Sequence, residues 1–246
     1  MKTYVISDVH GLGAKFTNFL RILDPEDIVY VLGDVIDRGP DGIQILQYIM
    51  NHPDQFKMIL GNHEHMMLTY LEAARRVDFE KASYMNHEEI NYLYDRWAIR
   101  NQGIPTLEYY EKLPKEQQEQ IYQFIKNLPV TYTNVKIKNY CFYLVHSMPK
   151  ELKKDVVYQQ DLPLREDLHQ FIWKRPSFLE TCHIDDKIVI SGHTITIKYH
   201  DKLEIYFSKD KEGNIRYIDI DCGCAMNCDD SKLACLCLDD MSVQYF

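Results

Sequence analysis

The chain reads, near its start, Asp27-Ile28-Val29-Tyr30-Val31-Leu32-Gly33-Asp34-Val35-Ile36-Asp37-Arg38-Gly39. The first part of this stretch is rich in β-branched residues, which favours a buried strand. The strand-like run stops at Gly33-Asp34, and further polar residues follow it. An apolar strand that ends in charged residues is typical of an α/β fold with a ligand site beyond its strand ends.

The same junction recurs at four other places in the chain. The strand-like runs and the polar residues that follow them are 2–6 with Asp8-x-His10, 56–60 with Gly61-Asn62-His63-Glu64, 140–145 with His146, and 187–190 with Gly192-His193. In an open α/β sheet, ligands bind in the crevice beyond the carboxyl ends of the strands, so these clusters are expected to converge. Asp, His and Asn together suit Mn²⁺, Zn²⁺ or Fe better than metals that prefer thiolates.

Taken singly, several of these clusters have a simpler interpretation. Asp8-x-His10 alone fits a helix N-cap followed by a surface histidine, and Gly33-Asp34 alone fits an ordinary turn. His146 alone fits a hydrogen-bonded histidine of the core. Five such clusters in one chain, each at a strand end, favour a shared site over coincidence.

The remaining pattern predicts how the chain is organised. Helices expected near 15–23 and 43–50 alternate with the first three strands, which indicates an α/β class. From 64 to 128 the chain is rich in helix-forming residues, so we expect a helical cap insertion within a single domain spanning 1–246. Segments 196–207 and 215–246 are expected to form successive antiparallel strands or hairpins, with a turn at 211–214.

Composition and charge exclude several classes of function. The 246 residues are 46% hydrophobic, and 28 basic against 37 acidic residues give a net charge of −9. A general nucleic-acid binder or a binder of anionic membranes needs a cationic surface, so neither partner is expected. Residues 1–8 lack the regions of a signal peptide, and no apolar run approaches the ~20 residues of a membrane span. We therefore expect a cytoplasmic protein.

The five clusters resemble the motifs of the calcineurin-like metallophosphoesterases. The matching residues are Asp8-Val9-His10-Gly11, Gly33-Asp34-Val35-Ile36-Asp37-Arg38-Gly39-Pro40, Gly61-Asn62-His63-Glu64, His146 and Gly192-His193-Thr194. In the arginine of the second string, the chain resembles the phosphoprotein phosphatase family. Because the chain is short, it resembles the small bacterial and phage serine/threonine phosphatases of that family. The symmetrical diadenosine tetraphosphate hydrolases are also similar. The resemblance implies a four-layer α/β/β/α sandwich with two mixed sheets and a helical cap.

The resemblance also implies a site for two divalent metal ions. The implied ligands are Asp8 and His10 for the first ion, Asp34 as the bridge, and Asn62, His146 and His193 for the second ion. A carboxylate that bridges two dications holds them ~3.5–4 Å apart, and such a pair activates a shared water for in-line attack on phosphorus. Mn²⁺ is the expected metal, with Zn²⁺ and Fe as alternatives because they accept the same ligands.

Four further residues match positions that assist the chemistry in this family. His63 matches the general acid that protonates the leaving alkoxide, a step worth ~10²–10⁴-fold in rate. Asp37 matches the carboxylate that orients this histidine and favours its charged form. Arg38 matches a phosphate clamp, because a planar guanidinium binds two phosphate oxygens. Arg175, in Trp173-Lys174-Arg175, is the candidate for a second clamp, with an ordinary surface arginine as the alternative.

The implied function is hydrolysis of phosphomonoesters, with phosphoserine or phosphothreonine in proteins as the leading substrate. Hydrolysis of a small substrate such as diadenosine tetraphosphate is the second hypothesis. A non-catalytic phosphate- or metal-binding module is the third, although no matched ligand or acid is missing. The cap at 64–128 and the loops at 149–180 are expected to decide between the substrates. A roomy groove favours a phosphoprotein, and a closed pocket with aromatic walls favours the dinucleotide.

Two positions depart from the family pattern. Leu60 precedes Gly61, where eukaryotic relatives carry an arginine, and the cap reads Asn101-Gln102-Gly103, where some bacterial relatives carry Asn-Gly-Gly. These changes leave the implied ligand set intact and bear on substrate preference.

The cysteines of the tail suggest a second metal site only weakly. They stand at 222, 224, 228, 235 and 237, without the two Cys-x₂₋₄-Cys pairs that are usual for structural zinc. Free cysteine also behaves as a small buried apolar residue, so we favour cysteines that pack along the last strands.

Overall fold

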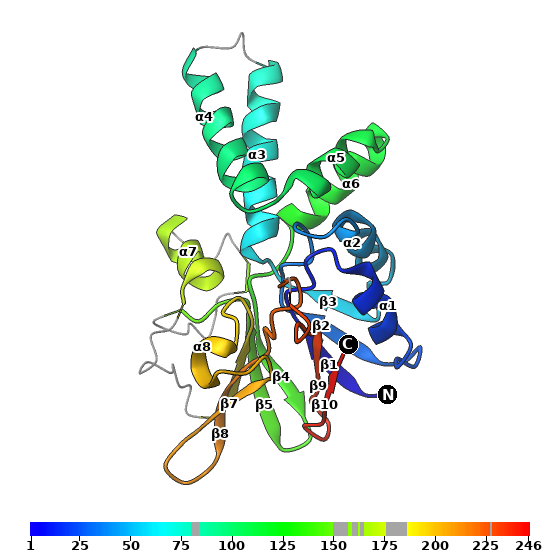
Figure 1. The fold of residues 1–246 in the computed structure, drawn as a ribbon, viewed down its shortest axis with the longest axis vertical. Coiled ribbons are helices and arrows are strands. Elements are labelled where there is room, and N and C mark those ends of the chain that lie inside the picture. Colours follow the sequence, from blue (N-terminus) through cyan, green and yellow to red (C-terminus); the bar gives the residue numbers. More distant parts are fainter. Residues whose placement is uncertain (80–83, 150–156, 159–161, 163–164, 176–185, 227) are drawn as a thin grey trace.

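Two five-stranded mixed sheets form the centre of the molecule, as a computed structural model shows (Figure 1). The model describes residues 1–79, 84–149, 157–158, 162, 165–175, 186–226 and 228–246. Residues 150–156, 159–161, 163–164 and 176–180, which belong to the loops predicted to set specificity, lie outside the described residues.

The first sheet combines the start of the chain with its end. Its strands are β1 (Thr3–Ile6), β2 (Ile28–Val31), β3 (Phe56–Met58), β9 (Ala234–Cys237) and β10 (Val243–Tyr245). They lie in the order β10-β9-β1-β2-β3. β1, β2 and β3 are parallel, and β9 runs antiparallel to β1. The carboxyl ends of β1, β2 and β3 therefore lie at one edge of the sheet.

The second sheet holds the strands from the middle of the chain. They are β4 (Thr131–Ile137), β5 (Tyr140–Val145), β6 (Ile188–Ser191), β7 (Tyr206–Lys209) and β8 (Ile215–Asp219). Their order is β4-β5-β6-β8-β7, in which β5, β6 and β8 are parallel. The outer strands β4 and β7 run antiparallel to their neighbours.

Alternation along β1 shows how the layers are built. Tyr4 and Ile6 belong to one hydrophobic cluster with residues of the helices α1 (Gly13–Leu20) and α2 (Gly42–Asn51). Val5 belongs to a second cluster, together with Phe142 and Leu144 of the opposite sheet. Because successive side chains of a strand point to opposite faces, helices cover one face of the first sheet and the second sheet covers the other.

The outer face of the second sheet is covered in the same way. Phe171 of α7 (Arg165–Trp173) shares a cluster with Tyr143 and Val145 of β5, and Tyr199 of α8 (Ile197–His200) packs against that cluster. These layers confirm the predicted α/β/β/α sandwich with two mixed sheets.

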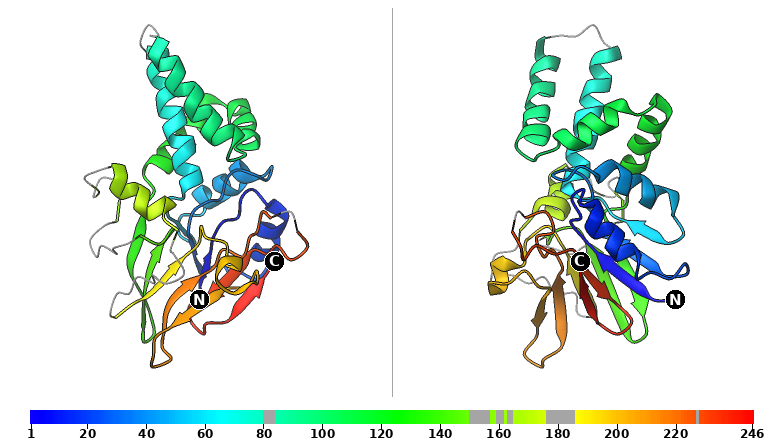
Figure 2. Two further views of the ribbon diagram at one scale, coloured as in Figure 1. Left: turned by 60° about the vertical axis from the view of Figure 1, so that its left-hand side comes forward. Right: turned by 45° about the vertical axis from the view of Figure 1, so that its right-hand side comes forward.

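A group of helices rises from one end of the sheets. It consists of α3 (Asn62–Phe79), α4 (Tyr84–Tyr94), the π-helix η1 (Asp95–Ile99), α5 (Ile104–Lys112) and α6 (Lys115–Lys126). Both views in Figure 2 show these cyan and green helices standing away from the sheets, with the hairpin of β7 and β8 at the opposite end. The stretch predicted to be a helical cap is thus helical.

The strands predicted at 196–207 are wrong in their first part. Ile197–His200 forms the short helix α8, and β7 begins only at Tyr206. Tyr199 N donates to Thr196 O at 2.9 Å, and Thr196 N donates to Asp221 O at 2.9 Å. Backbone groups that are satisfied within a turn need no partner strand, so the alternating apolar residues here do not form one. The turn predicted at 211–214 is confirmed, with Gly213 at φ 88° between β7 and β8.

Candidate metal centre

Five strand ends meet at the edge of the sandwich that carries the helical insertion (Figure 1). Each supplies predicted site residues: Asp8 and His10 after β1, Asp34 after β2, Asn62 and His63 at the start of α3, His146 after β5, and His193 after β6. These seven side chains are 0–5% exposed. The two sheets therefore bring together groups that are up to 185 residues apart, as in the contact of His193 N with Asp8 Oδ2.

Asp34 lies at the centre of this group. Its Oδ2 is 3.4 Å from His146 Nε2, 3.8 Å from His10 Nε2 and 4.0 Å from His63 Nε2. Two sets of possible ligand atoms result, one from His10, Asp34 and His63, and one from Asp34, His146 and His193. Within each set the atoms lie within 4.8 Å of one another. Asp34 is the residue that the two sets share.

Two histidines are oriented by backbone carbonyls. His10 Nδ1 lies 3.1 Å from Ile36 O, and His146 Nδ1 lies 2.6 Å from Leu32 O. A histidine that donates through Nδ1 keeps the lone pair of Nε2 for a metal, which is the usual outer-sphere arrangement of metal ligands. Both Nε2 atoms point toward Asp34, since the Nε2 distances to Oδ2 are short.

Asp8 is held by its neighbour Ser7 and by the loop that follows β6 in the second sheet. Its Oδ2 accepts hydrogen bonds from the Ser7 hydroxyl and, at 2.9 Å, from the backbone N–H of His193. Its Oδ1 faces His10 Nε2 at 3.8 Å. Gly192 allows the His193 N–H to approach Asp8 Oδ2, because a Cβ at position 192 would lie 2.0 Å from Ser7 Oγ and 2.3 Å from Asp8 Oδ2.

The loops that carry the site have an unusual backbone. Positive φ angles occur at Asp8 (50°), His10 (49°), Asp34 (54°), Asp37 (71°) and His193 (66°). Such conformations cost of order 1–3 kcal/mol each for residues with a side chain, and they persist only where the surroundings fix them. One fixing contact is the hydrogen bond from His10 N to Asp34 O at 3.0 Å.

Glu64 is a site residue whose role the sequence pattern does not reveal. Its buried carboxylate accepts four backbone N–H groups, from Asp34 (2.9 Å), Val35 (2.8 Å), Ile36 (3.3 Å) and Gly61 (3.2 Å). Glu64 thus clamps the loop after β2 to the start of α3. Its position in the Gly61-Asn62-His63-Glu64 string is the one signal in the sequence that could have identified it.

The site concentrates negative charge away from water. Burial raises the pKa of Asp8, and the charges of Asp221 and Asp34 raise it further. Although burial also acts on Asp34, His146 and His63 hold its pKa well below its ordinary value. The pKa of His146 rises to about 10, because Asp34 and Asp8 outweigh the effect of burial. Buried carboxylates of this kind require a compensating cation.

The donor set fits divalent metal ions. Burial holds the pKa values of His10 and His193 well below the ordinary histidine value, which favours the neutral imidazoles that metal ligation needs. His146, whose pKa is raised by Asp34 and Asp8, would release its proton when a metal ion binds. Carboxylate oxygens, neutral imidazoles and the Asn62 amide oxygen, which lies 3.0 Å from His146 Nε2, suit Mn²⁺, Zn²⁺ or Fe.

His63 and Asp37 form a close pair beside this set. His63 Nδ1 is 2.7 Å from Asp37 Oδ2, and both side chains are at most 1% exposed. Burial opposes the charged form of His63, yet Asp34 and Asp37 raise its pKa above the ordinary histidine value. The pair can therefore hold a proton at the edge of the site.

The two predicted phosphate clamps lie on the exposed rim. Arg38 is exposed, and its Nη2 lies 3.5 Å from His63 Nε2. Arg175 is exposed as well, and its charge helps to lower the pKa of His193. Both guanidinium groups are thus near the buried set yet reachable from solvent.

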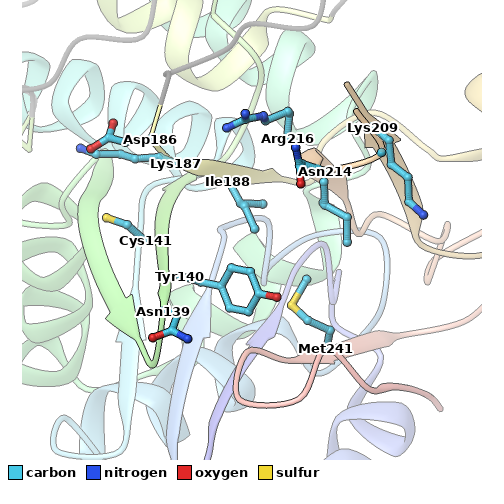
Figure 3. Close-up of a pocket in the computed structure, with 12 residues that line it drawn as sticks. Asn139, Tyr140, Cys141, Asp186, Lys187, Ile188, Lys209, Asn214, Arg216 and Met241 are labelled. Carbon is cyan, nitrogen blue, oxygen red and sulfur yellow. The ribbon is translucent and has the colours of Figure 1, made fainter. Parts of the chain in front are cut away.

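A separate cavity lies at the other end of the sheets (Figure 3). It has a volume of about 520 Å³, and Tyr140, Ile188 and Met241 line it together with polar residues from the β7–β8 hairpin. Its lining residues include none of the predicted site residues. It lies at the beginning of β5 and β6, whereas ligands of α/β sheets bind beyond the carboxyl ends.

The cysteine-rich tail gathers no metal site within the described part of the chain. Cys235 and Cys237 are buried on β9, Cys222 and Cys224 are buried before it, and Cys228 is exposed. The sets of metal-ligating groups found among the described residues contain no cysteine. Cysteines that pack along the last strands are the interpretation that this arrangement supports.

Comparison with known proteins places this geometry in context. The family model of the calcineurin-like phosphoesterases matches residues 1–196. A symmetrical bis(5'-nucleosyl)-tetraphosphatase of Chromobacterium violaceum is 32% identical over 80 residues, which cover 31% of this chain and 29% of the relative. One of Wigglesworthia glossinidia brevipalpis is 26% identical over 176 residues, covering 66% and 63%. The chain therefore spans less than two thirds of the length of these relatives.

A solved structure with a similar fold is a protein serine/threonine phosphatase from Saccharomyces cerevisiae. It has a TM-score of 0.59 at 14% sequence identity, and the match covers 100% of this chain and 79% of that one. At this identity the likeness establishes the fold alone.

Proposed function

The chain belongs to the calcineurin-like phosphoesterase family and is a phosphoester hydrolase, and from this premise we propose that it dephosphorylates phosphoserine or phosphothreonine in proteins. The proposal includes a site for two divalent metal ions at the edge of the sandwich. The observation that carries it is the position of Asp34, whose carboxylate belongs to both sets of converging ligand atoms.

The proposed ligands follow from these sets and their neighbours. They are Asp8 and His10 on one side, Asp34 as the bridge, and Asn62, His146 and His193 on the other. Two ions held there would supply a nucleophilic water at neutral pH and would neutralise charge on the phosphoryl group. Mn²⁺ is our proposed metal, and the same donors accept Zn²⁺ and Fe.

The proton for the leaving group comes from His63 in this proposal. Its Nδ1 is fixed by Asp37, so Nε2 faces Asp34 and Arg38 on the side of the site. An imidazolium at this place can donate its Nε2 proton to the departing alkoxide oxygen. General-acid assistance of this kind contributes ~10²–10⁴-fold for a poor leaving group.

Arg38 and Arg175 are proposed to bind the phosphate oxygens. Both are exposed on the rim, where the phosphoryl group of a large substrate can reach them. A guanidinium fork forms paired charge-assisted hydrogen bonds with two phosphate oxygens. The two arginines would thus orient the phosphorus for attack along the line of the leaving oxygen.

The tyrosines of the insertion support a protein substrate over a dinucleotide. Tyr110 is 4% exposed and donates its hydroxyl to Gln118 O, and Tyr109 packs against the hydrophobic core. Tyr94 lies beside Tyr70, with tilted rings whose centroids are 6.1 Å apart, and Tyr92 is 62% exposed on α4. Among the described residues, these rings serve the packing of the insertion or face solvent, and they do not enclose a pocket of the kind that adenine needs.

Hydrolysis of dinucleoside tetraphosphates is the second candidate. The observation that favours it is the name of the two curated relatives described above, which are symmetrical bis(5'-nucleosyl)-tetraphosphatases. The ligand set proposed above would serve both reactions, so the surroundings of the leaving group decide between them.

A substrate panel tests the proposal. Protein stripped of metal by a chelator and then given Mn²⁺ is assayed on p-nitrophenyl phosphate, a phosphoserine peptide and diadenosine tetraphosphate. We expect activity that depends on added metal and a higher kcat/KM for the phosphopeptide. A higher kcat/KM for the dinucleotide would transfer the assignment to the second candidate. Undiminished activity after complete metal removal would refute the two-metal site.

A further inference from the structure

The general-acid pair receives a third member from the helical insertion. Trp97 Nε1 donates a hydrogen bond to Asp37 Oδ2 at 2.9 Å, and the same oxygen lies 2.7 Å from His63 Nδ1. Trp97 and Asp37 are fully buried, and His63 is 1% exposed. One carboxylate oxygen thus binds an indole that is 60 residues away and an imidazole that is 26 residues away.

The orientation of the Asp37 carboxylate depends on these two contacts of Oδ2, because its other oxygen makes no such contact among the described residues. Asp37 Oδ1 is buried and has no hydrogen-bond partner among the described residues. Among the described residues, the side-chain contacts of this carboxylate thus come from one side, from His63 and Trp97. If the indole N–H were lost, His63 alone would hold Asp37, and the plane of the carboxylate would be free to rotate about its bond to Cβ.

The backbone beneath this carboxylate is also held by the insertion. Asp37 N donates to Thr106 Oγ1 at 2.9 Å, and Arg38 N donates to Gln102 O at 2.9 Å. Asp37 and Arg38 both have positive φ angles, of 71° and 67°. Strained conformations of this kind persist only where neighbouring groups fix them. The segment from Trp97 to Thr106 supplies three such groups.

The placement of the indole depends on three local features. Trp97 lies in the π-helix η1, and single π-turns of this kind are frequent at functional sites. Gly103 leaves room for the ring, because a Cβ there would lie 2.6 Å from Trp97 Nε1. Tyr70 packs against the indole with ring centroids 5.4 Å apart.

We propose that Trp97 is a positioning residue of the general acid, and that it holds Asp37 so that Asp37 can hold His63 toward the leaving group. This inference rests on the proposed function and adds the helical insertion to its machinery. Trp97 touches neither substrate nor metal ligands in this account. Its effect should therefore depend on how much the leaving group needs a proton.

The central variant is Trp97→Phe, which keeps an aromatic ring and removes the N–H. On phosphoserine, whose alkoxide leaves poorly, we expect kcat to fall about tenfold, a part of the ~10²–10⁴-fold that general-acid catalysis contributes. On p-nitrophenyl phosphate, whose phenolate leaves without a proton, kcat should change less than twofold. KM for both substrates should stay unchanged. Equal losses on the two substrates, or a change confined to KM, would overturn the proposal.

Two further variants separate positioning from packing. Tyr70→Phe is the matched control, since it changes a ring neighbour of Trp97 and leaves the indole N–H in place, so neither kcat should change. Gly103→Ala should displace the indole and reproduce the selective loss of Trp97→Phe. It also carries the test if the Phe variant does not fold. A Gly103→Ala enzyme with the wild-type ratio of the two kcat values would contradict the proposal.

A double-mutant cycle links the effect to His63. In a His63→Asn background, Trp97→Phe should cause no further loss on phosphoserine, because residues that act as a unit are not additive. Independent tenfold losses would mean that Trp97 acts elsewhere. If the wild-type protein with Mn²⁺ hydrolyses neither substrate, the proposed function fails. If it is active and Trp97→Phe is not selective, this inference alone fails.

The hydrogen bond between Trp97 and Asp37 can also be tested by NMR, without measuring catalysis. In metal-free protein, the indole N–H signal of Trp97 in an ¹⁵N–¹H NMR spectrum is assigned by its loss in Trp97→Phe. We expect slow exchange with solvent, and a shift of that signal in Asp37→Asn, whereas the Trp173 signal should stay in place. An unshifted Trp97 signal in Asp37→Asn would contradict the hydrogen bond on which the proposal rests.

Discussion

At the scale of single residues, the site depends on side chains that are each fixed at two points. His10 and His146 use Nδ1 on a backbone carbonyl and turn Nε2 toward Asp34. Asp34 in turn accepts His63 N through Oδ1 at 3.0 Å and leaves Oδ2 for the histidines. Ligand side chains that are already oriented in the folded protein lose little conformational entropy when a metal ion binds, which favours binding.

We expect the loss of His63 to lower kcat most for substrates whose leaving group needs a proton. His63→Asn should lower kcat on phosphoserine by ~10²–10⁴-fold, the contribution usual for general acids. On p-nitrophenyl phosphate the loss should be much smaller. Steady-state kinetics on the two substrates measure the ratio. Equal losses on both would argue that His63 has another role.

Glu64 is expected to matter for stability. Glu64→Gln replaces one of its two acceptor oxygens by an N–H₂ group that faces backbone donors, so we expect a loss of about 2–4 kcal/mol in the free energy of unfolding. Urea denaturation measures it. Glu89→Gln is the control, because its ion pair with Arg76 is exposed and worth at most ~1 kcal/mol. A loss at position 64 no larger than in the control would contradict the clamp.

At the scale of elements, the parallel strands place the site and the insertion completes it. Figure 1 shows α3 rising directly from the strand ends, and α3 begins with Asn62 and His63. The segment from η1 to α5 then returns to the loop of Asp37. The insertion is therefore connected to the acid pair by hydrogen bonds as well as by the chain.

The segment before β9 offers a test through the buried thiol of Cys224. Burial raises the pKa of Cys224 from 9.0 to about 12. Because the pKa is higher in the folded state, burial of the neutral Cys224 thiol contributes fully to the free energy of unfolding below pH 9. This contribution is lost as the pH rises toward 12, where the unfolded thiol ionises and the folded one does not. The slope is at most ~1.4 kcal/mol per pH unit for one thiol. Under reducing conditions, Cys224→Ala should make the decline of unfolding free energy between pH 9 and 10.5 shallower.

The control for this prediction is the exposed Cys228, since Cys228→Ala should leave the decline unchanged. A Cys224→Ala protein with the wild-type slope would show that Cys224 ionises as readily in the folded state. Release of zinc from the tail by a chelator, with loss of stability, would instead revive the hypothesis of a cysteine zinc site.

Sequence patterns reveal the strands that carry the site and miss the elements that depend on tertiary contacts. Continuous apolar runs at 4–6, 28–32 and 140–145 precede Asp8, Asp34 and His146, so their strands and the polar residues after them were predictable. β4 alternates with polar residues and was not predicted, and the segment at Ile197–His200 was assigned to a strand although it is a helical turn.

The contacts around the acid pair show the same limit. The Asp37–His63 pair was predictable from its family motifs. The indole of Trp97 reaches Asp37 only through the π-helix η1 and the space above Gly103, and neither feature has a recognisable local pattern. Glu64 stood inside a motif, yet its four backbone partners belong to other loops.

At the scale of the whole molecule, the negative charge and the proposed anionic substrate can be reconciled. The net charge is −9, and several of the carboxylates, among them Asp8, Asp34 and Asp37, are buried at the site. Two dications would add +4 there, so the local charge would govern phosphate binding, whatever the total. No helix in the described part of the chain is long and apolar enough to span a membrane.

The resemblance to the calcineurin-like phosphoesterases is confirmed by the family match over residues 1–196, and the sandwich is confirmed by its layers. The assignment of each ligand stays a prediction, and its centre is the shared carboxylate of Asp34.

Counting bound metal tests that centre most directly. Metal-free protein is equilibrated with Mn²⁺, passed over a desalting column, and analysed by native mass spectrometry beside Asp34→Asn. We predict two Mn²⁺ ions per wild-type chain and the loss of both from Asp34→Asn, with the variant still folded by circular dichroism. A wild-type chain that binds one ion or none, or an Asp34→Asn chain that keeps two, would contradict a dinuclear site bridged by Asp34.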